Sequence, residues 1–172
     1  SYAVDVIIDG DYVYVAGGND TGAIYYSLIE KRNIADGSLV WDENIQTQTS
    51  PASIYGRVTD IACDNSYIYI GVYEYWVSGS AKWQGKVIQV AKSDGSNSVV
   101  HTGAVYTSSS SYQTAYEISV ATASRTGSGL GNVYILTQDY IQPLDDRWVT
   151  TFTTLRYGSV HIDYNTVDCS LK

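Results

Sequence analysis

Carboxylates are the residues of this chain whose spacing offers the clearest chemistry, because their hard oxygens are the ligands that calcium prefers. Five aspartates recur at equivalent turn and strand-edge positions: Asp5, Asp9, Asp11, Asp60 and Asp64. Turn formation also explains these five, since aspartate favours turns by bonding its own backbone. A second group, around Pro143, consists of Asp139, Asp145 and Asp146. Three carboxylates on one predicted loop make this group the better candidate for a calcium site, with a solvated loop as the alternative.

Aromatic residues gather around a long polar loop that the pattern predicts between Trp76 and Gln84. The candidate ligand-binding residues are Trp76, Trp83, Tyr73 and Tyr75. Exposed aromatic rings in such a loop stack on sugar rings or become buried in a partner chain. The alternative is that they cover the sheet from which they come. A glycan-binding protein would use Trp148 as a further stacking platform beside Trp76 and Trp83.

The histidines give little support for catalysis. His101 and His161 fall at similar places in two repeats, and a metal site would need a third ligand beside them. No serine or cysteine is arranged near either one in sequence as a nucleophile, and spacing alone identifies no carboxylate pair for glycoside hydrolysis. We therefore predict that the chain is not an enzyme and carries no cofactor, with calcium as the candidate ion.

Two cysteines and one tripeptide are candidates for covalent modification. Cys63 alternates with polar neighbours in a predicted strand and is expected to face a core, while Cys169 lies near the C-terminus. In an extracellular chain, a disulfide between them would stabilise the fold by about 4–5 kcal/mol in the chain-entropy model. The alternative is two unpaired buried thiols. Asn19-Asp20-Thr21 is a glycosylation sequon in a predicted surface loop.

A repeat positions these candidates. The segment 5–15 returns 55 residues later as 60–70, and both copies read Asp, apolar, two residues, Asp, two residues, then Tyr-β-Tyr-β, where β is Val or Ile. A third, degenerate copy has Asn132 in place of the first tyrosine. Apolar and polar residues alternate with period two, which predicts strands rather than helices. A repeat of this length indicates stacked supersecondary units.

Each repeat is predicted to form a four-stranded antiparallel meander of the size of one propeller blade. The predicted strands of the first two repeats are 4–8, 12–16, 24–32 and one from 39, then 58–63, 67–75, 86–92 and 98–105. Those of the third are 117–123, 132–136, 148–156 and one near 160. The predicted fold is one all-β domain, 1–172, of three tandem propeller-like blades over 1–52, 53–108 and 112–166. A serine-rich segment, 107–111, is predicted to be a flexible linker. The alternative fold is a single two-sheet β-sandwich.

The stretch 30–41, Glu-Lys-Arg-Asn-Ile-Ala-Asp-Gly-Ser-Leu-Val-Trp, resembles the blade-ending segment of the quinoprotein-like β-propeller repeat family. Those repeats end a blade with a glycine, three residues and a tryptophan, the spacing of Gly37 and Trp41. Val99 lies near the corresponding place in the second repeat, and the third ends in Ile162. The resemblance implies propeller blades. It does not extend to the quinone, calcium ligands and catalytic base of that family's enzymes.

The composition excludes several classes of protein. Of 172 residues, 44% are hydrophobic and 16% charged, and the 17 tyrosines suit half-exposed sheet faces of secreted or cell-surface proteins. A net charge of -8 argues against binding to nucleic acid or to anionic membranes. The apolar runs are too short for membrane insertion. The sequence contains no methionine and starts at Ser1, so we expect a processed chain or an excised piece.

Three blades would leave two exposed sheet edges, which favour pairing with another chain. We therefore predict a non-enzymatic extracellular or cell-surface structural or binding module. It would self-associate or assemble, as in a filament or surface layer, through open sheet edges. Its partners would be copies of itself or the remaining blades of a longer chain. The alternatives are a carbohydrate-binding propeller lectin and a fragment of a larger quinoprotein-like propeller enzyme.

Overall fold

Antiparallel β-meanders make up the part of the chain that the computed structural model describes. The described residues are 2–20, 25–45, 55–78, 80–102, 106–108, 117–124, 131–141, 147–156 and 163–168. They form thirteen strands, and no helix occurs in these ranges. The prediction of an all-β chain is therefore confirmed.

The first meander has four strands in chain order: β1 (Tyr2–Asp9), β2 (Tyr12–Asp20), β3 (Tyr25–Asn33) and β4 (Leu39–Ile45). Each strand pairs with the next in an antiparallel ladder. Gly10 turns the β1–β2 hairpin with a φ of 57°, and Gly37 turns β3 into β4 with a φ of 71°. Positive φ values favour glycine, which explains the Asp-Gly pairs at both turns.

The second meander repeats this order: β5 (Tyr55–Cys63), β6 (Tyr67–Ser78), β7 (Ser80–Ala91) and β8 (Asn97–Thr102), with a short β9 (Tyr106–Ser108). The long loop predicted between Trp76 and Gln84 is wrong. Strands β6 and β7 continue through it as one hairpin that pairs Tyr75 with Trp83 and Ser78 with Ser80. The linker predicted at 107–111 is also wrong in part, because β9 pairs with β7 at 81–83.

The third meander contains β10 (Glu117–Ser124), β11 (Gly131–Ile141), β12 (Arg147–Arg156) and β13 (Asp163–Asp168), again antiparallel and in chain order. Its first hairpin pairs Ala123 with Asn132, the register that Asp9 and Tyr12 have in the first meander. The last strand predicted near 160 falls outside the described residues, and the described part of this segment is β13. The third copy of the repeat is thus present in the backbone register of its first two strands.

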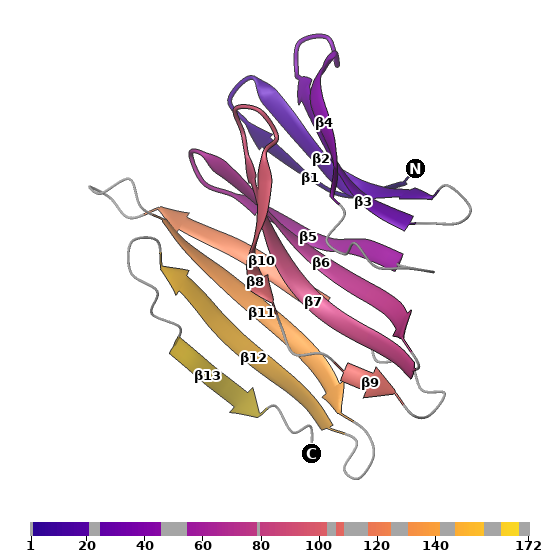
Figure 1. Cartoon of the computed structure of the whole chain (residues 1–172). Helices are drawn as coiled ribbons and strands as arrows, with labels where there is room; N and C mark the ends of the chain where they lie inside the picture. Colours follow the sequence, from indigo (N-terminus) through magenta and orange to yellow (C-terminus); the bar gives the residue numbers. More distant parts are fainter. Residues whose placement is uncertain are drawn as a thin grey trace.

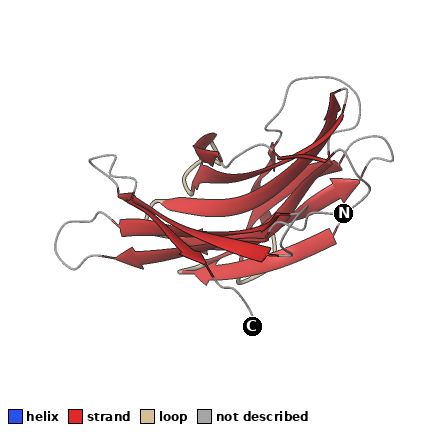
Figure 2. Ribbon diagram, turned by 90° about the horizontal axis from the view of Figure 1, so that it is seen from below, coloured by secondary structure: helices blue, strands red, loops and turns tan. Residues whose placement is uncertain are grey.

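The meanders stack face on face (Figures 1 and 2). A single parallel pair, Tyr25 with Tyr55, joins the first two into a nine-stranded sheet, while β10–β13 form a separate four-stranded sheet. Strand β5 packs against β1, β2 and β3, and β10 packs against β5 and β6. In Figure 1 the first and third meanders lie at opposite ends, so the described strands do not close into a ring.

The repeat is reproduced at the level of single hydrogen bonds. Asn33 N donates to Ser38 O at 2.9 Å, and Ala91 N donates to Ser96 O at 2.8 Å. Ile34 N donates to Asp11 O, and Lys92 N donates to Ser66 O in the same way. These matching bonds show which positions of the two meanders are equivalent. Ile34 of the first meander is equivalent to Lys92 of the second.

Candidate functional site

The main core lies between the first and second meanders. The first meander contributes one face, here called its inner face, which carries the buried residues Tyr14, Ala16, Ile29 and Ile45. The second meander contributes its docked face, which carries Ile61, Ile68, Ile70, Ile88 and Val90. Burial of this apolar surface is the principal force that holds the two meanders together.

Lys92 makes several polar contacts across this interface. Its Nζ lies 2.5 Å from Asp9 Oδ2 on the β1–β2 hairpin and also donates to the carbonyl of Asp64. Its own carbonyl accepts from Lys31 Nζ at 2.7 Å and from Trp41 Nε1 at 3.3 Å. Both ends of Lys92 therefore connect the second meander to the first.

Aromatic rings surround the two lysine ammonium groups. Lys31 Nζ lies 3.9 Å from the centroid of the Tyr12 ring, a distance that allows a cation–π interaction. Burial, with the nearby charge of Lys92, lowers the pKa of Lys31 below its usual value. Burial, with the charge of Asp9, raises the pKa of Tyr14 to about 12. The Tyr14 hydroxyl is therefore protonated at neutral pH.

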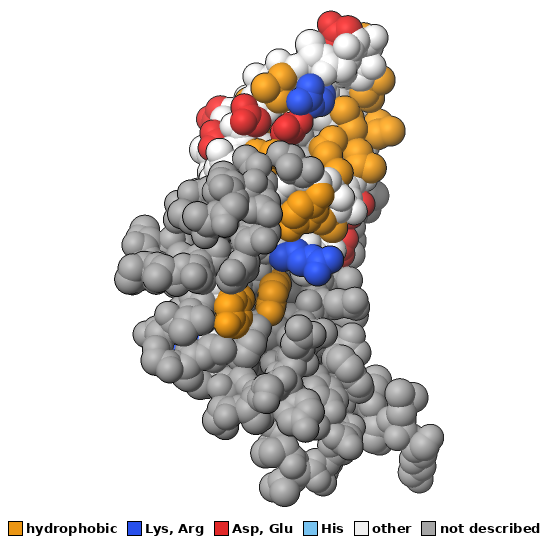
Figure 3. Space-filling view, turned by 90° about the vertical axis from the view of Figure 1, so that its right-hand side faces the viewer, with side chains coloured by type: hydrophobic (Ala, Val, Ile, Leu, Met, Phe, Trp, Pro, Cys, Tyr) orange, Lys and Arg blue, Asp and Glu red, His pale blue; other side chains and the backbone are white. Residues whose placement is uncertain are grey.

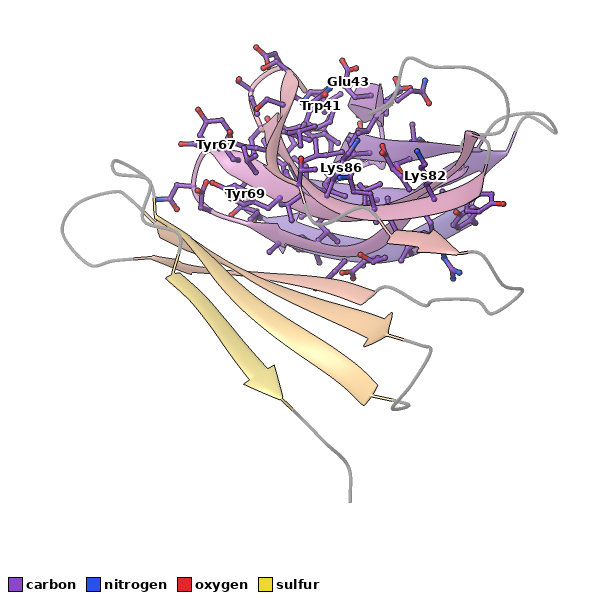
Figure 4. All side chains as sticks on the ribbon, turned by 60° about the horizontal axis from the view of Figure 1, so that its bottom comes forward. Trp41, Glu43, Tyr67, Tyr69, Lys82 and Lys86 are labelled. Carbon is purple, nitrogen blue, oxygen red and sulfur yellow. The ribbon has the colours of Figure 1, made fainter. Side chains whose placement is uncertain are left out.

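A second buried ion pair lies on the docked face of the second meander. Lys86 Nζ is 2.6 Å from Glu74 Oε2, and both side chains are buried. Figure 4 shows Lys86 among the side chains between the stacked strands. Burial raises the pKa of Glu74, and the hydrogen bond and charge of Lys86 oppose that rise.

The opposite side of the first meander, here called its outer face, is exposed and partly apolar. Val6 is 55% exposed, whereas its equivalent Ile61 in the second meander is 5% exposed. Ile34 is 48% exposed, whereas its equivalent Lys92 is 8% exposed. Ile8, at 72%, is more exposed still. The outer face thus carries apolar residues at positions that the second meander buries.

Hydrophobic side chains gather over the upper part of the molecule in Figure 3, at the height of β1–β4 in Figure 1. The exposed large hydrophobic residues of the first meander are Tyr2, Val4, Val6, Ile8, Ile34, Leu39 and Val40. In the middle of this face, Arg32 Nε pairs with Glu30 Oε2 at 2.7 Å, where the second meander has Val90 and Ile88. The outer face therefore carries the exposed Val6, Ile8 and Ile34 together with this ion pair.

The recurring aspartates bond the backbone. Val6 N donates to Asp5 Oδ1 at 2.8 Å, and Ile61 N donates to Asp60 Oδ1 at 2.9 Å, each beside an irregularity in the ladder. Asp64 Oδ1 accepts from the amides of Ser66 and Tyr67, which closes the β5–β6 turn. The interpretation of these residues as structural is confirmed for Asp5, Asp60 and Asp64.

The predicted calcium group does not share one loop, because Asp139 lies within β11, opposite Val149. The other two members, Asp145 and Asp146, are outside the described residues, so the ion itself stays a prediction. Within the described part of the chain, no group of three or more His, Cys, Asp and Glu side chains is placed to hold a metal.

The predicted aromatic site is likewise rearranged. Tyr73 and Tyr75 are half-buried on β6, and Trp76 and Trp83 belong to the β6–β7 hairpin rather than a loop. Trp148 lies in β12, opposite Tyr140. The exposed loop on which the glycan-binding prediction depended is therefore replaced by a hairpin. Glycan binding by these residues stays a prediction.

The remaining sequence-based candidates have mixed outcomes. Cys63 is half-buried and packs against the main core, as expected, but Cys169 lies outside the described residues and the disulfide is untested. Asn19 lies in β2 opposite Tyr26 and not in a loop. His101 is in β8, and His161 is outside the described residues.

Sequence reasoning missed Lys31, Lys92 and the Glu74–Lys86 pair. A signal was present, because period-two alternation places Lys86 and Lys92 on the same strand face as Ile88 and Val90. Charged residues in such a row indicate either a solvated edge or a buried contact. Only the position of the neighbouring meander distinguishes the two.

Neither a protein-family model nor a curated protein matches this chain. Among the described residues there is no helix with the length and hydrophobicity required to cross a bilayer.

Proposed function

We propose that this chain is a non-enzymatic structural module that builds a larger assembly, with its three meanders acting as blades of a propeller-like arc. The packing of the first strands is evidence for this arc. Strand β5 packs against both β1 and β10, as the innermost strands of adjacent blades would. The second meander also packs residues on both of its faces. Ala62, Tyr69 and Val87 form a second cluster on the side away from the first meander.

The observation that carries the assembly proposal is the outer face of the first meander. Its apolar residues occupy the positions by which the second meander docks on the first. Large exposed apolar patches on proteins mark interaction sites. A further blade, from another copy or from a longer chain, would cover this face. The high tyrosine content of the sequence favours an extracellular or cell-surface setting for the assembly.

The mass of the purified chain in solution tests this proposal. Light scattering over rising protein concentration should give masses above the 18.8 kDa of a single chain, and electron microscopy should show rings or filaments. Strict retention of the single-chain mass at the highest accessible concentration would contradict self-assembly.

A further inference from the structure

We infer that the outer face of the first meander binds the third meander of a second copy of this chain, with Ile34 of one copy against Ala123 of the other. The face of the third meander that takes part is the one whose positions match, in strand register, the inner face of the first meander, and it is called the inner face of the third meander below. This inference rests on the proposed self-assembly and specifies its geometry. The contact joins two different surfaces, so it would repeat from copy to copy as a ring or a filament.

The observed interface between the first two meanders supplies the template. There, the inner face of one meander receives the docked face of the next, and Lys92 reaches Asp9 on the neighbouring hairpin. Ile34 occupies the Lys92 position on the outer face, because both backbone amides donate to the same place in their own meander's first hairpin. An apolar side chain therefore replaces the lysine on the outer face.

The third meander has the matching replacement. Ala123 pairs with Asn132 in the register in which Asp9 pairs with Tyr12, so alanine holds the position of the aspartate. Thr154 pairs with Tyr134 as Lys31 pairs with Tyr14. The third meander thus lacks both charged residues that contact Lys92, and the outer face lacks the lysine.

The apolar centre of the inner face is kept in the third meander. Leu136 pairs with Phe152 in the register of Ala16 with Ile29. Polar contacts are therefore lost on both sides of the proposed interface while apolar positions remain on both. Such complementarity favours this pairing over one in which Ile34 would face the aspartate of the first or second meander.

The central ion pair of the outer face is compatible with docking. Arg32 donates through Nε to Glu30, and its second nitrogen donates to Gly37 O at 3.1 Å. Both charges therefore have partners within the same meander before a second copy binds. A covered pair that is already satisfied costs less to bury than a lone charge.

The test is an exchange of charges on the full-length chain. Ile34→Lys alone and Ala123→Asp alone should each weaken association at least about tenfold, because each would bury a charge against an apolar residue. The double variant, or a mixture of the two single variants, should restore association to within about threefold of the original chain. Sedimentation velocity over a concentration series measures these constants, and circular dichroism checks that each variant is folded.

Two controls complete the test. Val99→Lys changes an equally exposed valine on β8 and should leave association unchanged. Ile34→Lys combined with Ala123→Lys should not restore association.

If the original chain associates but the Ile34 and Ala123 variants associate equally well, the inference is overturned and self-assembly stands. Weakening by both single variants without recovery in the double variant also overturns the pairing. A chain that stays monomeric overturns both the inference and the proposed assembly.

Discussion

The buried Glu74–Lys86 pair provides a quantitative test of how polar groups are accommodated between the meanders. The two charged atoms are 2.6 Å apart, which corresponds to an attraction of about 6 kcal/mol at an effective dielectric constant near 20. Removing each ion from water costs several kcal/mol, so the intact pair contributes little net stability. Lys86→Met leaves the carboxylate without its counter-ion and should lower the free energy of unfolding by about 3–5 kcal/mol at pH 7.

The pH dependence of this loss has a definite sign. Burial already raises the pKa of Glu74 above its usual value of 4.5, and loss of Lys86 removes the influence that opposes the rise. The folded variant then keeps a proton that the unfolded chain releases above pH 4.5. Stability of Lys86→Met should therefore fall as the pH rises from 4.5 toward the raised pKa, and the loss should be small at pH 4.

Urea denaturation of the two single variants and the double variant measures the coupling. Glu74→Leu and Lys86→Met should each destabilise the chain, whereas the double variant should lie within about 1 kcal/mol of the original because it buries no charge. The expected coupling energy is therefore at least about 3 kcal/mol in magnitude. Additive losses, with coupling below about 0.5 kcal/mol, would refute the view that the two charges compensate each other inside the fold.

Three further outcomes follow from equivalent positions and from burial. Ile61→Ala should cost about 2–5 kcal/mol in urea denaturation, whereas the equivalent Val6→Ala should cost less than about 0.5 kcal/mol; equal losses would contradict the difference in burial. Gly37→Ala and Gly95→Ala share the strain of positive φ. A Cβ at Gly95 would also lie 2.8 Å from Cγ of Glu43, which Figure 4 labels, so Gly95→Ala should lower the melting temperature further. Unfolding free energies at several pH values should show stability falling as the pH rises from 10 toward 12, since the folded state retains the Tyr14 proton that the unfolded state loses. Tyr14→Phe should reduce that fall, and an unchanged alkaline profile would argue against the raised pKa.

Local sequence was enough to predict the strands and turns of the first two hairpins. Asp-Gly pairs mark the tight turns, and Gly10, Gly37 and Gly95 adopt the positive φ values that such turns need. Alternation in the Tyr-β-Tyr-β segments gives the two faces of β2 and β6. The buried Tyr14 and Tyr69 confirm that each of these strands has a face turned to a core.

Contacts between segments distant in sequence account for the predictions that failed. Gly17 and Gly18 lie beyond the predicted strand 12–16, yet they continue β2 by pairing with the first residues of β1. Those residues approach too closely for a Cβ atom, which explains the two glycines. Sequence spacing places Val99 near the position of Trp41, but the irregularity in β8 pairs Val99 with Ile88, and Val100 packs against the second core cluster. A one-residue change in register moves a side chain to the other face of the sheet. The local sequence pattern does not show where such a change occurs.

The outer face of the first meander shows both what local sequence predicts and what only contacts between distant segments decide. Strand periodicity alone predicts that Val6 and Ile8 share a face, but it cannot say whether that face is covered. The second meander answers this for its own copy of the face, where equivalent residues form the main core. The outer face has Ile34 at the position equivalent to Lys92, and the third meander has Ala123 at the position equivalent to Asp9. This pair of differences is stronger support for an interface than the exposure of the outer face alone. Two unrelated surface changes would have no reason to be complementary, whereas two sides of one interface would, and this complementarity is what the charge-exchange variants measure.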